Sequence, residues 1–172
     1  LTAMQKSVKL APQDAEAHNN LGNTLQELGK LDEAEASYIQ AIVLKPDYAL
    51  AHSNLGITLN ELGRLDEAEA SLRQAIALKP NYAKAHFNLG VTLYELGRLE
   101  EAEASLRQAI GLKPDHAKAH FNLGNARKEL GRLDEALASY TQAIGLKPDY
   151  AEAHNNLGNI LKELGRLDEA LA

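Results

Sequence analysis

Six histidines are the side chains of this 172-residue sequence with the clearest capacity for chemistry. A neutral imidazole can bind a metal ion or exchange a proton near pH 7. His116 and His120 lie four residues apart, so one face of a helix would carry both, but a metal site needs converging ligands and no third ligand is evident. Five of the six recur at intervals of 34 residues, which separates them by a whole structural unit: His18, His52, His86, His120 and His154. We therefore expect no metal site and no cofactor.

The remaining residue types argue against catalysis. The sequence has no cysteine, which excludes disulfides, thiolate zinc sites and a cysteine nucleophile. It also lacks a glycine-rich phosphate loop, a nucleophile elbow and a zinc-protease motif. Acidic residues such as Asp66, Glu67 and Glu69 recur where a helix should begin, and there negative charge favours the helix dipole. We expect that this stretch is not an enzyme by itself.

The balance of charge and hydropathy excludes two classes of partner. Eighteen basic against 24 acidic residues give a net charge of −6, so a phosphate backbone would meet net repulsion. The mean hydropathy is −0.33 and no apolar run reaches the roughly 18 residues of a membrane helix. We expect no nucleic acid partner, no membrane span and a cytoplasmic location. The start at Leu1 rather than at methionine is consistent with a fragment of a longer chain.

The elements that position these residues form an internal repeat. All five prolines are 34 residues apart, and ten of the twelve glycines follow the same interval. We number the positions of each copy from 1 to 34, with Ala15 at position 1 of the first. The sequence then divides into a tail, four complete copies and a partial copy: 1–14, 15–48, 49–82, 83–116, 117–150 and 151–172.

Each copy has the pattern of two helices. In 49–82, two stripes of apolar residues recur at helical spacing and meet near Gly63, where a left-handed residue would end the first helix. Pro80 should end the second helix. Asp66 and Asn81 are predicted to cap the second helix and the next first helix. Neither helix can bury its apolar stripe alone, so neighbouring copies must stack.

This pattern resembles the tetratricopeptide repeat. The resemblance rests on Leu55, Gly56, Ala68, Ala75 and Pro80, which recur through the chain at the same positions. Histidine stands where tryptophan is common at position 4, and leucine where tyrosine is common at positions 11 and 17. The resemblance implies an all-α solenoid that forms a right-handed superhelix, with first helices lining a concave groove. Members of the family mostly bind peptides or proteins.

The predicted groove is where the copies differ most. Copies 49–82 and 83–116 differ at eight positions, and four of these, positions 2, 5, 9 and 12, fall on one arc of the first helix. Apolar side chains peak in the middle copies, which predicts a peptide-binding patch with basic edges. The patch consists of Ile57, Phe87, Val91, Tyr94 and Phe121, edged by Lys84, Lys118 and Lys128. The alternative is that Phe87 and Phe121 pack between neighbouring repeats.

Position 6 is asparagine in every copy that contains it. A row of amides along a groove could hold an extended peptide through its main chain. The row resembles the asparagine ladder of O-linked N-acetylglucosamine transferases and consists of Asn20, Asn54, Asn88, Asn122 and Asn156. The alternative is that each asparagine bonds an adjacent helix and fixes the repeat spacing. A carboxylate clamp like that of chaperone-binding repeats would match at Asn23, Asn54 and Lys84, but two of its charged donors are missing.

These observations predict a scaffold that binds an extended peptide or protein segment in the groove. One alternative is the substrate-recruiting repeat region of a larger enzyme, such as an O-linked N-acetylglucosamine transferase. Another is a self-assembling array, because the terminal repeats leave apolar stripes for end-to-end self-association.

Overall fold

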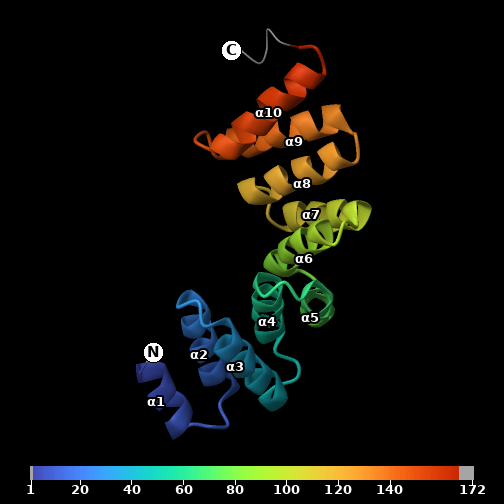
Figure 1. Ribbon diagram of the computed structural model, residues 1–172. Helices are drawn as coiled ribbons and strands as arrows, with labels where there is room; N and C mark the ends of the chain where they lie inside the picture. The colour runs from blue at the N-terminus through green and yellow to red at the C-terminus, as the bar shows by residue number, and fades with distance from the viewer. Residues whose placement is uncertain (1, 167–172) are drawn as a thin grey trace.

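The structure is a computed structural model that describes residues 2–166, and these residues form ten α-helices and no strand. The first helices of the copies are α2 (Ala15–Glu27), α4 (Ala49–Glu61), α6 (Ala83–Glu95), α8 (Ala117–Glu129) and α10 (Ala151–Glu163). The second helices are α3 (Leu31–Leu44), α5 (Leu65–Leu78), α7 (Leu99–Leu112) and α9 (Leu133–Leu146), and α1 (Thr2–Leu10) precedes them. Successive pairs stack into an elongated α-solenoid with α1 and α10 at opposite ends (Figure 1). The predicted all-α solenoid is confirmed.

Glycine ends each first helix as the sequence predicts, but the predicted caps are wrong. Gly63 has a φ of +76°, and the amide of Arg64 donates to the carbonyl of Leu59, which closes the end of α4. The same turn starts α5, so Arg64 occupies its N-cap position without a side-chain hydrogen bond and Asp66 lies inside the first turn. Asn81 likewise precedes the N-cap of α6, which is Tyr82. Both predicted residues therefore miss the N-cap positions, which Arg64 and Tyr82 occupy without a side-chain hydrogen bond.

Close approach of the two helices in a pair depends on glycine at position 8. A Cβ added to Gly22 would lie 2.6 Å from Cε1 of Tyr38, and one added to Gly56 would lie 2.6 Å from Cγ of Leu72. Alanines along the second helix, such as Ala34, are fully buried in the same interface. The first helix therefore packs tightly on whichever large side chain occupies position 24 of its partner.

The histidines at position 4 join successive copies. Nε2 of His52 lies 2.9 Å from the carbonyl oxygen of Pro46, and the other four lattice histidines make the same bond to the proline six residues earlier, at 2.8 to 3.0 Å. The ring thus holds the loop that connects one pair to the next. Sequence reasoning placed these histidines at position 4 of each copy and missed this hydrogen bond.

One copy replaces an apolar core residue by an ion pair. Position 11 is a buried leucine in α2, α4, α6 and α10 but Arg127 in α8. Nε of Arg127 lies 3.0 Å from Oε1 of Glu103, and Nη1 of Arg132 lies 2.8 Å from Oε2 of the same carboxylate. Nη1 of Arg127 also donates to Oγ of Ser139 at 3.0 Å. This cluster links α7 to the α8–α9 pair.

Candidate functional site

A cleft opens on the face formed by the first helices. Its volume is about 300 Å³ and its lining comes from α2, α4 and α6: Asn23, Gln26, Glu27, Leu50, Asn54 and Lys84. Four of the six lie at positions 2, 9 and 12, which the sequence identifies as variable, and Asn54 belongs to the asparagine row. We call this side of the solenoid the groove face.

The asparagine row is not uniform in its surroundings. Asn20 is exposed, Asn54 is buried, and Asn88, Asn122 and Asn156 are half-buried. Nδ2 of Asn54 donates across the joint to Oδ1 of Asn19 at 3.1 Å and to Oδ1 of Asn23 at 3.0 Å. Nδ2 of Asn156 donates to Oδ1 of Asn125 at 3.1 Å.

The two central asparagines make no such bond. Nδ2 of Asn88 donates to the carbonyl of Lys84 in its own helix at 2.8 Å. Among residues 2–166, the side chain of Asn122 has no protein hydrogen-bond partner. The predicted row therefore contains members that fix the repeat spacing and members whose hydrogen-bonding capacity is not used by the fold.

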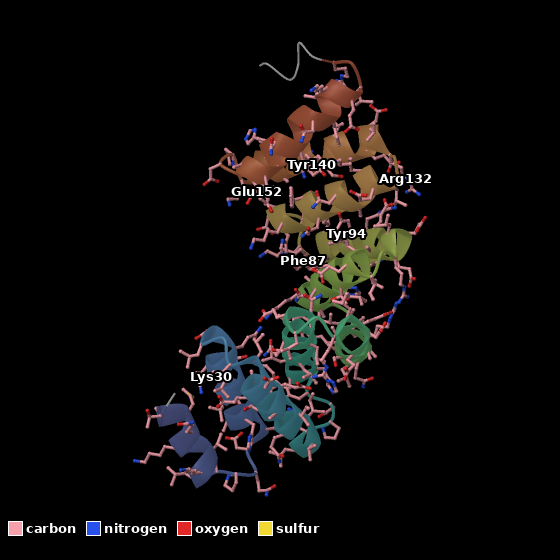
Figure 2. The ribbon with its side chains drawn as sticks, viewed as in Figure 1. Lys30, Phe87, Tyr94, Arg132, Tyr140 and Glu152 are labelled. Carbon is pink, nitrogen blue, oxygen red and sulfur yellow. The ribbon has the colours of Figure 1, made fainter. Side chains whose placement is uncertain are left out.

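The predicted aromatic patch lies on the groove face but is also part of the packing. The rings of Phe87 and His116 stack with centroids 4.6 Å apart. Phe121 lies 4.9 Å from the ring of Tyr150 and 5.7 Å from that of Tyr140. All five predicted members of the patch are half-buried, so each keeps some surface for a ligand: Ile57, Phe87, Val91, Tyr94 and Phe121. Figure 2 places Phe87 and Glu152 on one side of the stack and Arg132 on the other.

His116 has a second role beside its stacking contact. It occupies the N-cap position of α8, where its Nδ1 accepts from the amide of Ala119 at 3.2 Å. The corresponding residues of α4, α6 and α10 are tyrosines without a side-chain cap. Burial, followed by the charge of nearby Lys113, lowers the pKa of the His116 imidazole.

The predicted lysines have different environments. Nζ of Lys84 lies 3.4 Å from Oδ1 of Asn54, and desolvation in the cleft lowers the pKa of this lysine. By accessible surface Lys84 and Lys118 are both exposed, and Lys128 is half-buried. The structure thus brings Asn23, Asn54 and Lys84 together in one cleft, although the clamp to which they would belong lacks its other charged donors.

Three further clefts lie between successive second helices, and no pattern in the sequence predicted them. Their volumes are about 330, 380 and 370 Å³, and they repeat the same lining of isoleucine, histidine, leucine, serine and glutamine. Their rims differ at position 25, which is Ile39 in the first and Arg73 and Arg107 in the others. Within residues 2–166, no group of three acidic or histidine side chains is placed to hold a metal ion. No described helix has the length and apolar character needed to cross a membrane.

Comparisons with known proteins give one family and a set of similar folds. The family model of the cilia and flagella-associated protein 70 C-terminal domain matches residues 1–172. Among curated proteins, none matches the chain. A crystal structure of MamA has a TM-score of 0.82 and 27% identity over 87% of this chain and 88% of that one. YrrB, described as a TPR protein with an unusual peptide-binding site, has a TM-score of 0.81 and 25% identity over 98% and 87%. PilF of Pseudomonas aeruginosa, at 23% identity and a TM-score of 0.82 over 88% and 69%, shares the fold.

Proposed function

Because this chain belongs to the tetratricopeptide repeat family of the cilia and flagella-associated protein 70 C-terminal domain, we propose that it is a scaffold that binds an extended protein segment along its groove face. Tetratricopeptide repeat proteins are typically interaction modules without catalytic activity. The observation that carries the proposal is the cleft built from α2, α4 and α6. Half-buried apolar side chains on α6 and α8 support it.

The chemistry of the groove face suits an extended segment. Amides at position 6 can donate to and accept from a peptide main chain, which every sequence offers. The half-buried surface of Phe87, Val91 and Tyr94 on α6 can receive apolar side chains, and a contiguous apolar patch usually marks an interaction site. A ligand would therefore have an apolar centre next to polar residues that meet the cleft at Asn23 and Lys84.

The experiment is selection of peptides from a displayed random library, followed by fluorescence anisotropy with the enriched peptides. The test variant combines Phe87→Asn with Tyr94→Lys, two substitutions on α6. Asparagine already occurs at position 5 and lysine at position 12 of other copies. We expect affinity to fall about tenfold or more, as for truncation of interface anchors.

The matched control is Ile39→Arg, which places on the second-helix side the residue found at position 25 of the next two copies. Circular dichroism verifies that both variants keep their helices. If the control loses affinity and the α6 variant does not, the ligand lies against the second helices. If no peptide is enriched and light scattering shows concentration-dependent association, self-assembly replaces ligand binding.

A further inference from the structure

The solenoid contains two kinds of joint, which differ in the buried residue at position 24 of the second helix: tyrosine in the first and fourth complete copies and leucine in the two middle copies. Tyr38 and Tyr140 are fully buried, and each hydroxyl donates to an asparagine at position 9: Tyr38 to Oδ1 of Asn23 at 2.9 Å, and Tyr140 to Oδ1 of Asn125 at 2.8 Å. A buried hydroxyl without a partner would be costly, and asparagine at position 9 supplies an acceptor in both copies. In the first copy Oε1 of Gln26 is a second acceptor, 3.1 Å from the Tyr38 hydroxyl.

The middle copies carry leucine at position 24, and their position 9 is aliphatic. Leu72 and Leu106 are fully buried and offer no polar group. Ile57 and Val91 stand where the outer copies have asparagine. Position 9 of the middle copies is therefore aliphatic because the buried residue at position 24 is leucine, which needs no polar partner. Selection of a ligand is not needed to explain it.

This pairing extends across the joint to the asparagine row. Where position 9 is asparagine, it accepts from the position 6 amide of the next copy, at 3.0 Å for Asn54 and 3.1 Å for Asn156. Where position 9 is aliphatic, the next position 6 amide has no partner across the joint. Asn88 then bonds its own helix through Nδ2, and Asn122 has no protein partner among the described residues.

We propose that the buried residue at position 24 determines whether the groove asparagine of the next copy is held by the fold or is available to a bound segment. Asn88 and Asn122 are the asparagines that contact the ligand main chain, and Tyr38 and Tyr140 are positioning residues that keep Asn54 and Asn156 occupied. This assignment of ligand contacts rests on the proposed function, whereas the coupling between positions 24, 9 and 6 does not.

Side-chain amide exchange, measured by NMR, tests the coupling without a ligand. The double variant Ile57→Asn, Leu72→Tyr copies the pair of the first copy and should slow exchange of the Asn88 Nδ2 protons about fivefold, the effect of one added hydrogen bond. The reverse variant Asn125→Val, Tyr140→Leu copies the third copy and should speed exchange at Asn156 by a similar factor. Each variant pair already occurs at positions 9 and 24 of another copy, so the repeat accommodates it.

Unchanged exchange at both asparagines would overturn the coupling. The Asn122 protons give an internal reference for the variant Ile57→Asn, Leu72→Tyr, because its substitutions lie on α4 and α5 and not on α6 or α8.

The ligand arm uses a peptide enriched from the displayed library. Asn122→Ala should weaken its binding about fivefold and by more than Asn156→Ala does, and the variant Ile57→Asn, Leu72→Tyr should weaken it as well. Equal losses for Asn122→Ala and Asn156→Ala would overturn the assignment of contacts. If no peptide is enriched, the proposed function fails together with that assignment, while the exchange measurement still decides the coupling.

Discussion

The arginine that replaces a core leucine in α8 gives a prediction that can be worked out from the contacts. Only 17% of the Arg127 side chain and 8% of the Glu103 side chain are exposed. Substituting Arg127→Leu restores the residue found at position 11 of the other copies. It leaves Glu103 paired with Arg132 at 2.8 Å, and Oγ of Ser139 still donates to the carbonyl of Glu135 at 2.9 Å. No buried polar group therefore loses its last partner.

The magnitude follows from two opposing contributions. Burying a leucine side chain contributes about 2 kcal/mol. Replacing a buried ion pair by an apolar side chain is commonly neutral or stabilising. We expect Arg127→Leu to raise the free energy of unfolding by about 1 to 2 kcal/mol. Glu103→Ala should lower it by about 3 kcal/mol, because Arg127 is then left with Glu135, whose carboxylate lies 3.4 Å away and is half exposed.

The assay is urea unfolding followed by circular dichroism, with the free energy obtained by linear extrapolation. The double variant Arg127→Leu, Glu103→Ala completes a thermodynamic cycle and should be more stable than Glu103→Ala alone, because the guanidinium that lost its buried carboxylate partner is gone. A lower free energy of unfolding for Arg127→Leu than for the parent would refute this reasoning. It would mean that the ion-pair cluster stabilises the joint more than a leucine can.

Two further predictions concern single residues. The pKa of His116 is lowered in the fold, so the unfolded chain binds the proton more tightly than the folded chain. The free energy of unfolding should therefore be highest above about pH 6.5, the ordinary pKa of histidine, and should fall as the pH decreases through the folded pKa. Protonation also removes the Nδ1 acceptor for the amide of Ala119. His116→Tyr should flatten this part of the pH profile of urea midpoints, and an unchanged profile would contradict the assignment. Gly22→Ala should lower the free energy of unfolding by about 1 to 3 kcal/mol, because its Cβ would meet the Tyr38 ring. A thermal midpoint equal to that of the parent would show that α2 and α3 can move apart without loss of stability.

The repeat and its helices could be predicted because each feature recurs at a fixed interval. Periodic leucines and alanines identify buried faces, and glycine at position 15 ends a helix wherever it occurs. The predicted caps failed because each is displaced from the N-cap: Asp66 lies inside the first turn of α5, and Asn81 comes one residue before the N-cap of α6. That geometry depends on how many residues the turn contains, which propensities do not reveal.

The candidate site was only partly accessible from the sequence. Comparing copies position by position found the variable positions of the groove face, including those of Asn23 and Lys84. It did not relate one position to another, so the bond between Tyr38 and Asn23 was missed although tyrosine and asparagine occur together in the same two complete copies. It also missed that Phe87 and Phe121 use part of their ring surface within the fold.

The repeated bond between a histidine ring and the proline carbonyl six residues earlier has a mechanical consequence. Every joint has the same hydrogen bond, and each helix pair packs only on its neighbours. A pulling force applied at the two ends therefore meets a series of nearly equal unfolding barriers. Stretching should therefore extend the molecule in discrete increments. Each increment releases one 34-residue unit, about 110 Å of contour length. Under tension the solenoid would unfold one repeat at a time and would not unfold in a single cooperative event.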